Sequence, residues 1–188
     1  MKQQHSSSTP FPYTTLFRSA FMVKPLSEVY IPPVSALIAN EDYGQIKPSI
    51  IKWVEHAMNS EIAYVAVGNR REQWIIDVMA AVEAKKFPPP DVIGEEVIMG
   101  VGFATLGDKV GWLYGLYVHP AFRNMGLGKT LALARIAALR ELGAESAITE
   151  IAEWNGPAKK IYEKFDEEKV GKLYLYGKRK PAVRVRRR

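Results

Sequence analysis

Residues 123–130 read Arg-Asn-Met-Gly-Leu-Gly-Lys-Thr, and this glycine-containing stretch decides the fold. An apolar segment, Trp112 to His119, precedes it, and an Ala/Leu-rich stretch follows it as far as Gly143. This order predicts a strand, a glycine loop and a helix. The first N–H groups of a helix lack intrahelical partners, and its N-terminal dipole attracts anions. The loop is therefore a candidate phosphate cradle.

The spacing of the glycines limits which phosphate ligand the loop can hold. A nucleotide-binding P-loop ending in Gly128-Lys129 requires a glycine where Arg123 stands, and the G-x-G-x-x-G order of dinucleotide folds is absent. What remains is Arg-x-x-Gly-x-Gly, in which Gly126 and Gly128 allow the backbone to approach a ligand closely. Taken alone, this pattern also fits an ordinary glycine-rich helix start.

The flanking segments resemble the GNAT N-acetyltransferase superfamily. Segment 116–123, Leu-Tyr-Val-His-Pro-Ala-Phe-Arg, looks like the family's fourth strand running into its acetyl-coenzyme A loop. Segment 155–165 resembles the family's Asn-x-x-Ala-x-x-Leu-Tyr-Glu-Lys helix. The resemblance is clear over residues 97–178 and weaker over 21–67, and its motif spacing is most similar to that of ribosomal-protein N-terminal acetyltransferases. It implies a layered α/β (α+β) fold with a mixed, mostly antiparallel central sheet, splayed fourth and fifth strands, and helices on both faces.

Hydrophobic periodicity and chain-breaking residues predict the elements independently. Strands are expected at 21–25, 62–67, 97–106, 112–118, 148–151 and 173–177, the last closing the sheet, and helices at 33–40, 48–60, 71–86, 126–142 and 157–165. The helix at 126–142 is apolar nearly all round and is expected to be well buried. The helix at 71–86 departs from the family's tight hairpin, and is either a wall of the acceptor site or an added surface helix. Phe165-Asp166-Glu167 replaces the family's Leu-Gly-Phe and leaves the course of 165–170 open.

The resemblance also implies site residues. Those expected to hold acetyl-CoA, mainly through the backbone, are Leu116, Val118, Arg123, Asn124, Met125, Gly126, Leu127, Gly128, Lys129 and Asn155. Val118 would supply the N–H that stabilises the developing oxyanion. Tyr162 matches the family's general acid, although a core tyrosine on an amphipathic helix would look the same. Glu150 matches the general base, with a solvated strand-end glutamate as the alternative reading and Glu153 as a weaker candidate.

The histidines are not expected to take part in the chemistry. His119 is interpreted as shaping the turn before the loop, His56 is given no role, and no group of residues has metal-ligand spacing.

Composition fits one globular domain. The chain has 188 residues, is 47% hydrophobic and lacks cysteine. No segment is long and apolar enough to span a bilayer, so a cytoplasmic protein without membrane contact is expected.

Residues 1–19 are expected to be a non-native or disordered leader, because 11–19 resemble a translated sequencing adapter. The acetyltransferase domain is expected to span 20–178, with a basic disordered tail at 179–188.

These observations predict an N-acetyltransferase that moves an acetyl group from acetyl-CoA to a primary amine by direct attack. The acceptor is a protein N-terminus, a lysine or a small amine. The sequence leaves open whether the protein forms a homodimer.

Two alternative functions remain. One is an acyl-CoA-binding regulatory module without turnover, and the other is a nucleic-acid-binding protein acting through the arginine-rich tail. The tail explains the net charge of +6, but no aromatic residues accompany its basic ones, so nucleic acid is not favoured.

Overall fold

A computed structural model describes residues 21–42, 48–60, 62–84, 87–163, 165–170 and 173–177. The predicted leader at 1–19 and tail at 179–188 lie outside the described residues. In chain order the first elements are β1 (Met22–Pro25), η2 (Glu28–Tyr30), α1 (Ile31–Asp42), α2 (Pro48–Ser60), β2 (Ile62–Asn69), α3 (Gln73–Ala84) and β3 (Val92–Ile93). They are followed by β4 (Glu96–Gly107), β5 (Val110–Val118), η3 (Pro120–Phe122), α4 (Leu127–Glu141), β6 (Ser146–Ala152), α5 (Gly156–Ile161), β7 (Asp166–Val170) and β8 (Leu173–Gly177).

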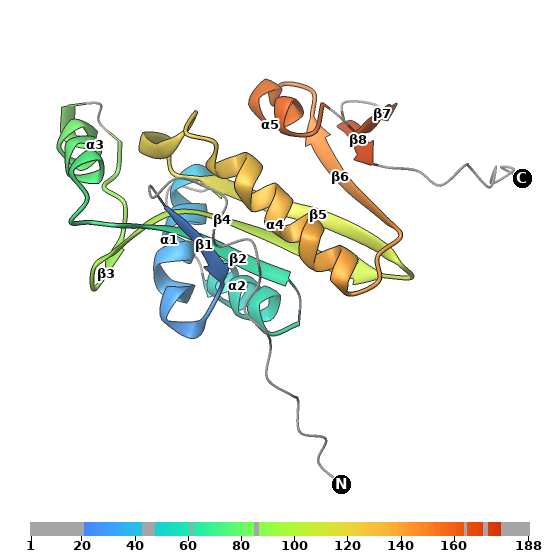
Figure 1. The fold of residues 1–188 in the computed structure, drawn as a ribbon, viewed down its shortest axis with the longest axis horizontal. Helices are drawn as coiled ribbons and strands as arrows, with labels where there is room; N and C mark the ends of the chain where they lie inside the picture. The colour runs from blue at the N-terminus through green and yellow to red at the C-terminus, as the bar shows by residue number, and fades with distance from the viewer. Residues whose placement is uncertain are drawn as a thin grey trace, which may run out of the picture.

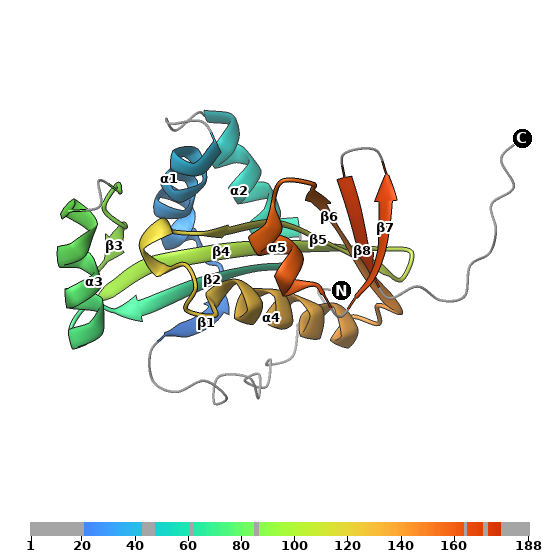
Figure 2. The same ribbon diagram turned by 90° about the horizontal axis from the view of Figure 1, so that it is seen from above.

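One sheet runs through the domain in the order β1-β2-β4-β5-β6-β8-β7, with β3 paired to β4. Neighbouring strands are antiparallel except for the parallel pair β5 and β6. Helices α1 and α2 cover one face and α4 covers the other (Figures 1 and 2). Helix α5 packs on the α4 side, where its Ala158 and Ile161 join Leu139 in one apolar cluster. The mixed, mostly antiparallel sheet with helices on both faces confirms the predicted fold class.

A tight hairpin joins β4 to β5. Its turn is Asp108-Lys109, with φ of +47° and +65°, which is the left-handed pair that a type I′ turn requires. The strands on either side keep an unbroken register from Gly107 opposite Val110 to Phe103 opposite Tyr114. The hairpin thus joins the two strands expected at 97–106 and 112–118.

Strands β5 and β6 diverge after a short parallel pairing. The ladder runs from Val110 opposite Ser146 to Leu113 opposite Thr149 and stops there, although both strands continue. A bulge in β5 accompanies the divergence, because its register on β4 shifts beside Gly115, which has a φ of +53°. Bulges bend a strand and increase its twist. We call the opening between residues 114–118 of β5 and 150–152 of β6 the fork. It is the splay that the family resemblance implied.

The C-terminal part of the domain differs from the sequence prediction in two places. Helix α5 ends at Ile161 and not at Phe165, because Tyr162 leaves the helical conformation with φ of −108° and ψ of 14°. The segment left open by the sequence forms β7, which is the edge strand. Strand β8 lies between β6 and β7, so it does not close the sheet as expected.

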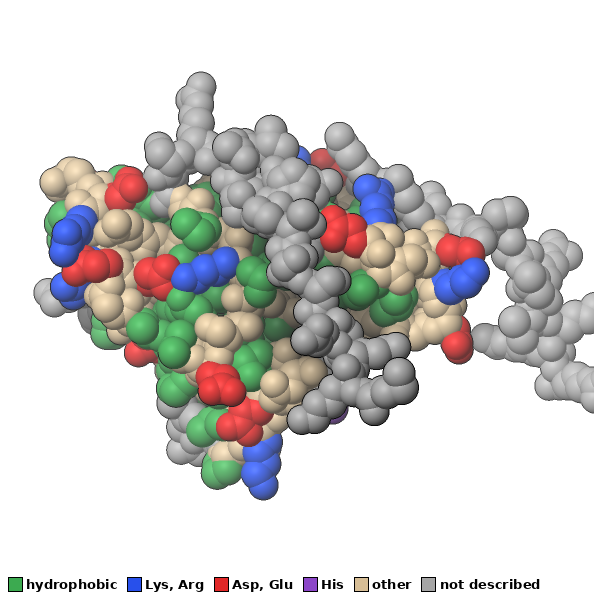
Figure 3. Space-filling model, turned by 60° about the horizontal axis from the view of Figure 1, so that its bottom comes forward, with side chains coloured by type: hydrophobic (Ala, Val, Ile, Leu, Met, Phe, Trp, Pro, Cys, Tyr) green, Lys and Arg blue, Asp and Glu red, His purple; other side chains and the backbone are tan. Residues whose placement is uncertain are grey.

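Helix α4 is buried along one stripe and not all round. Its fully buried side chains include Leu127, Leu131 and Leu139, whereas Leu133 is 47% exposed. The stripe also contains a charged residue, Arg135, with no exposed surface. On the face drawn in Figure 3, acidic and basic side chains of the described residues are interspersed, without a continuous basic surface.

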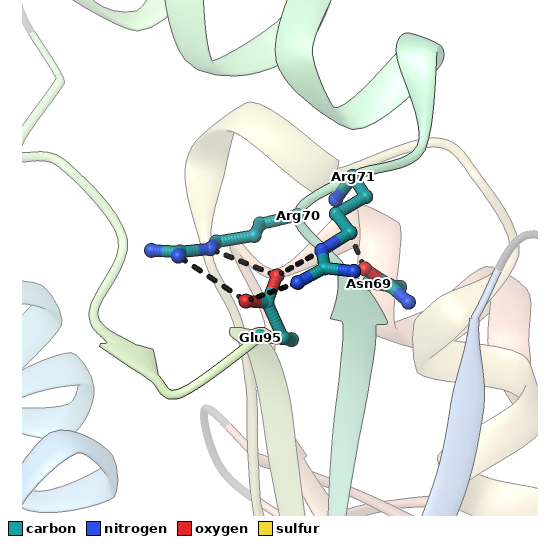
Figure 4. Close-up of polar contacts among 4 residues, drawn as sticks. All are labelled: Asn69, Arg70, Arg71 and Glu95. Atoms are coloured by element: carbon teal, nitrogen blue, oxygen red, sulfur yellow. Dashed lines mark hydrogen bonds and ion pairs between the residues drawn. The ribbon is translucent and has the colours of Figure 1, made fainter.

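The insertion between β2 and β4 is fixed at its base by a carboxylate shared between two arginines (Figure 4). Glu95 accepts from Arg70 Nε at 3.0 Å and from Arg71 Nε at 2.9 Å, and the hydrogen bonds from these two arginines lower the pKa of the Glu95 carboxyl. Backbone N–H of Arg70 also donates to Glu95 O. These contacts hold the end of β2 against the turn that leads into β4.

Helix α3 of the insertion packs beside the glycine loop. Trp74 meets Phe122 of η3 edge-on at 6.3 Å between ring centroids, and Ile75 is fully buried in the same cluster as Phe122 and Leu127. The contacts therefore place α3 on the side of the glycine loop, away from the face covered by α1 and α2.

Candidate active site

The glycine loop turns sharply between η3 and α4. Asn124 and Gly126 both adopt left-handed conformations, with φ of +66° and +87°. Gly126 is the N-cap of α4 and offers no side-chain cap, and a Cβ placed on it would meet nothing within 4 Å. The N-cap therefore adjoins open space and leaves the first N–H groups of α4 without a side-chain cap, as a phosphate cradle requires.

The side chains of the loop have different tasks. Leu127 is buried and anchors the start of α4, whereas Met125 and Lys129 are exposed. Arg123 Nε donates to the carbonyl of Val118 at 3.1 Å, so its side chain turns back onto the end of β5. Gly128 serves packing in this structure, because a Cβ there would lie 2.9 Å from Ile161 Cδ1 of α5. This contact is a reason for glycine at position 128 in addition to the expected approach of a ligand.

The backbone of Val118 faces the fork. His119 N donates to Met99 O at 2.9 Å, so these two residues form a hydrogen-bonded antiparallel pair. The next pair, Val118 opposite Gly100, must be a non-hydrogen-bonded pair, because the two kinds alternate along the ladder. The N–H of Val118 therefore points away from β4.

Tyr162 lies at the other side of the fork, at the C-terminal end of α5. Its side chain is only 3% exposed and packs with Ile151 of β6 and Leu139 of α4. Its hydroxyl oxygen accepts a hydrogen bond from Arg135 Nη2 at 3.0 Å. A phenol accepts through lone pairs and donates through its hydrogen, so this contact directs the hydrogen away from the guanidinium.

Arg135 and Thr149 satisfy carbonyl groups where the ladder between β5 and β6 ends. Arg135 Nη1 donates to Tyr114 O at 2.9 Å and to Phe103 O at 2.8 Å, and Nε donates to Leu131 O of its own helix. Thr149 Oγ1 donates to Leu113 O at 2.8 Å. Burial lowers the pKa of the Arg135 guanidinium, and the nearby Tyr162 hydroxyl partly offsets this. Arginine nevertheless remains charged in proteins.

Glu150 occupies the opposite face of β6 from Tyr162. Its neighbours Thr149 and Ile151 are buried, and Ile151 packs with Tyr162. Because side chains alternate along a strand, Glu150 points to the face covered by α1 and α2, where it is exposed. The base candidate Glu150 therefore lies on one side of the sheet, and the acid candidate Tyr162 packs against Ile151 on the other side. Glu153 is exposed in the turn that follows β6.

An aromatic cluster lies on the same face as Glu150. Trp53 of α2 meets Phe103 of β4 at 4.9 Å between ring centroids, and Tyr114 of β5 stacks on Phe103 at 5.9 Å. Trp53 and Tyr114 are half-buried. These rings form an apolar surface beside the fork.

Asn155 is the N-cap of α5. Its Oδ1 accepts from the backbone N–H of Ala158 at 3.2 Å, so the amide's donor end, Nδ2, is not part of the cap. Asn155 and Tyr162 thus flank the two ends of a helix of 6 residues.

His119 shapes the turn before the glycine loop, as expected. It is buried, its Nδ1 accepts from Ala121 N at 3.2 Å, and its Nε2 lies 2.8 Å from Pro88 O. A carbonyl can only accept, so these partners assign the neutral tautomer with the hydrogen on Nε2. The contact also ties the insertion to the loop. Within the described part of the chain, no group of three or more acidic, histidine or cysteine side chains could hold a metal ion.

Comparison with protein families identifies this arrangement. The model described as the acetyltransferase (GNAT) family matches residues 50–166, which contain the glycine loop, the fork and α5. The chain belongs to the GNAT acetyltransferase family. The resemblance read from the sequence is thereby confirmed, as is the expectation that the protein is an acyltransferase.

Solved GNAT structures share the fold over most of this chain. A GNAT-family acetyltransferase from Staphylococcus aureus Mu50 is 15% identical, with 85% of this chain and 98% of that chain covered and a TM-score of 0.60. The ribosomal-protein-S18-alanine N-acetyltransferase of Escherichia coli is 13% identical, with coverages of 84% and 90% and a TM-score of 0.56. The PaiA N-acetyltransferase of Thermoplasma acidophilum, solved with coenzyme A, is 15% identical, with coverages of 86% and 99% and a TM-score of 0.52.

A search of curated proteins finds no significant match. Among the described residues, none of the helices combines the length and apolar character needed to cross a bilayer.

Sequence reasoning missed the residues that organise the GNAT fork. Arg135 stands four residues after Leu131 and four before Leu139, in the middle of a stripe that is otherwise apolar. A single charge on the buried face of a helix was the available signal. The role of Thr149 had no comparable signal, because a threonine in a strand is common.

Proposed function

We propose that this GNAT protein transfers the acetyl group of acetyl-CoA to a primary amine. The proposal rests on two features that lie at the same end of β5. An uncapped helix N-terminus at Gly126 opens at the same end of β5 as the Val118 N–H, which points into the fork. Family membership and the coenzyme A in the Thermoplasma relative support acetyl-CoA as the cosubstrate.

The residues that would hold the cosubstrate are those of the glycine loop and the two sides of the fork. The open space at Gly126 fits a pyrophosphate, since backbone N–H groups and the dipole of α4 favour an anion there. Leu116, Val118 and Asn155 would bind the arm that leads to the thioester. Acetyl-CoA supplies an activated acetyl group that a free amine can attack directly.

The protein's own groups would handle charge and protons. The Val118 N–H donates to the carbonyl oxygen as it becomes negative, which is the interaction that lowers the barrier of acyl transfer. Glu150 accepts the proton that the attacking amine loses, directly or through water. Tyr162 donates a proton to the sulfur as the C–S bond breaks and the C–N bond forms.

We infer that the acceptor approaches from the face covered by α1 and α2. Glu150 lies on that face together with the half-buried rings of Trp53 and Tyr114. Such a surface suits an amine carried on an apolar or peptide-like group. A protein N-terminus is favoured by the spacing between Glu150 and Tyr162, with lysine or a small amine as the other acceptors.

The cofactor site can be tested with two matched glycine variants. Gly126 and Gly143 stand at opposite ends of α4, have φ of +87° and +88°, and would each place a Cβ in open space. Glutamate at either position adds the same charge and backbone strain of roughly 1–2 kcal/mol. Gly126→Glu should weaken acetyl-CoA binding on the order of tenfold or more by calorimetry, whereas Gly143→Glu should bind like the parent protein. Equal affinity of the two folded variants would show that the loop is not the phosphate site.

Turnover distinguishes an enzyme from a binding module. Release of free thiol from acetyl-CoA should be accelerated by at least one member of a panel of N-terminal peptides, lysine peptides and small amines. Tight acetyl-CoA binding without acceleration by any of these amines would favour the non-catalytic module.

A further inference from the structure

Arg135 is a buried cation whose described partners are all neutral oxygens. Its side chain has no exposed surface and donates to the carbonyls of Leu131, Phe103 and Tyr114 and to the hydroxyl of Tyr162. None of the ion pairs found among the described residues involves Arg135. A buried charge is expensive unless hydrogen bonds and an opposite charge compensate for it. The hydrogen bonds are present here, but no ion pair within the described part of the chain supplies an opposite charge to Arg135.

Tyr162 is the partner that can become negative. Its oxygen lies 3.0 Å from Arg135 Nη2, in a region from which water is largely excluded by Ile151 and Leu139. If Tyr162 gives its proton to the departing thiolate, the phenolate that forms stands directly against the guanidinium. Hydrogen bonds to an ionised acceptor are roughly twice as strong as neutral ones, so this contact strengthens as the proton leaves.

The same guanidinium also reaches the bulged strand. Nη1 holds the carbonyls of Tyr114 and Phe103, which flank the bulge at Gly115, and Nη2 holds the Tyr162 hydroxyl. The planar guanidinium of Arg135 therefore holds the Tyr162 oxygen at a fixed position relative to β5. Lysine, with one nitrogen, could not serve both sites with this geometry.

We propose that Arg135 is the positioning residue of the general acid. It holds the Tyr162 hydroxyl beside the fork and balances the negative charge on Tyr162 as the proton passes to sulfur. This inference rests on the proposed function. In the step concerned, the O–H bond of Tyr162 and the C–S bond of the thioester break, and the S–H bond forms. The phenolate recovers its proton from solvent after the products leave.

A double-mutant cycle on kcat tests the proposal. Arg135→Lys keeps a cation near the carbonyls and loses the separate donor to Tyr162. In the parent protein it should lower kcat about tenfold to a hundredfold, which corresponds to about 1.4 to 2.8 kcal/mol, with KM for acetyl-CoA nearly unchanged. In a Tyr162→Phe background the same substitution should change kcat less than about twofold, because the group through which Arg135 acts has been removed.

A second variant distinguishes loss of the Arg135–Tyr162 contact from a general disturbance of the structure at the fork. Thr149→Val removes the hydrogen bond to Leu113 O in the same region, whereas the Tyr162 hydroxyl is bonded by Arg135. Whatever factor it costs in kcat should therefore be the same in both backgrounds. Equal losses for Arg135→Lys in both backgrounds, or no loss in either, would overturn the inference. If circular dichroism shows that Arg135→Lys is unfolded, the cycle is built with Arg135→Met, which has a similar length and no charge.

Failure of the proposed function would look different. Wild-type kcat in Tyr162→Phe would remove Tyr162 as the acid, and absence of turnover in the parent protein would remove the reaction itself. Both results overturn the inference together with the proposed function. A slow Tyr162→Phe enzyme without coupling to Arg135 overturns the inference alone.

Discussion

The hydroxyl of Thr149 donates to the carbonyl of Leu113 at 2.8 Å, on the last rung that β5 and β6 share. Beyond this rung the strands separate, and the carbonyl groups of β5 lose the partners that a continued ladder would provide. A buried carbonyl without a partner is costly. Thr149 therefore stabilises the strand where the opening begins.

Replacing Thr149 by valine should destabilise the protein by about 1–3 kcal/mol, because the buried carbonyl of Leu113 loses its donor while the side-chain volume hardly changes. Urea denaturation followed by circular dichroism would measure the change. Thr105→Val in β4 is the matched control, since Thr105 is half-buried and its hydroxyl has no hydrogen bond among the described residues. Equal losses in the two variants would mean that the Thr149 bond contributes nothing specific.

Tyr162→Phe should lower kcat on the order of a hundred- to ten-thousand-fold, the usual loss when a positioned general acid is removed. The ring and its packing against Phe165, at 5.4 Å between centroids, remain. Acetyl-CoA affinity should change little, because the anchor is the glycine loop. Steady-state kinetics and calorimetry on the same preparation check both statements. Turnover at the parent rate would show that the thiolate leaves without this acid.

Glu150→Gln should slow turnover most at low pH, where the acceptor amine is protonated and removal of its proton matters most. At high pH the free amine needs less assistance, so the defect should shrink. The measurement is kcat/KM for the amine across the pH range, with Glu153→Gln as the control from the next turn. A defect in Glu153→Gln with none in Glu150→Gln would move the base role to Glu153.

The hydrogen bonds of Glu96 make the free energy of unfolding depend on pH. It accepts from Lys24 Nζ at 2.5 Å and from the Tyr30 hydroxyl. Burial alone would raise the pKa of Glu96, but these two hydrogen bonds outweigh it and lower the pKa from its usual 4.5. A lowered pKa means that the stabilisation is complete at neutral pH and is lost as pH falls below about 4.5.

In Glu96→Gln, the free energy of unfolding should therefore fall less between pH 7 and pH 3.5 than it does in the parent protein. The effect should be below about 1 kcal/mol, because the carboxylate is partly exposed and screened by solvent. Urea midpoints at pH 7 and at pH 3.5 measure it, and Glu28→Gln, an exposed acid on η2, is the control. A parent-like acid dependence in Glu96→Gln would assign the loss to other carboxylates.

The sequence predicted the elements for which hydrophobic periodicity and chain-breaking residues indicate the same boundaries. Helix α2 begins at Pro48 and ends at Ser60 as expected, and the hairpin turn falls on Asp108-Lys109. The end of α5 was placed too late, because the apolar spacing continues to Phe165 whereas the backbone leaves the helix at Tyr162. Local spacing carries no information on where tertiary contacts end a helix.

The site residues chosen from motif spacing stay a prediction, and the contacts that support them were not predicted from the sequence. Motif spacing selected Gly126, Val118 and Tyr162, and the structure brings these residues to the two sides of one opening. The link between Arg135 and Tyr162 joins residues 27 positions apart on different helices. Only the folded chain brings them together, and helical periodicity assigned the Arg135 position to an apolar stripe. The divergence of β5 and β6 likewise depends on pairing that no single segment encodes.

The turn at Asp108-Lys109 has a consequence for the order in which the domain assembles. Strands β4 and β5 are joined by 2 residues, whereas residues 70–95 must be spanned before β2 can pair with β4. Loop-closure entropy favours the shorter connection by roughly 2 kcal/mol. We expect the hairpin to nucleate refolding and β2, with the insertion, to join later. The strand that bears the Val118 amide is then already organised when its other neighbours arrive.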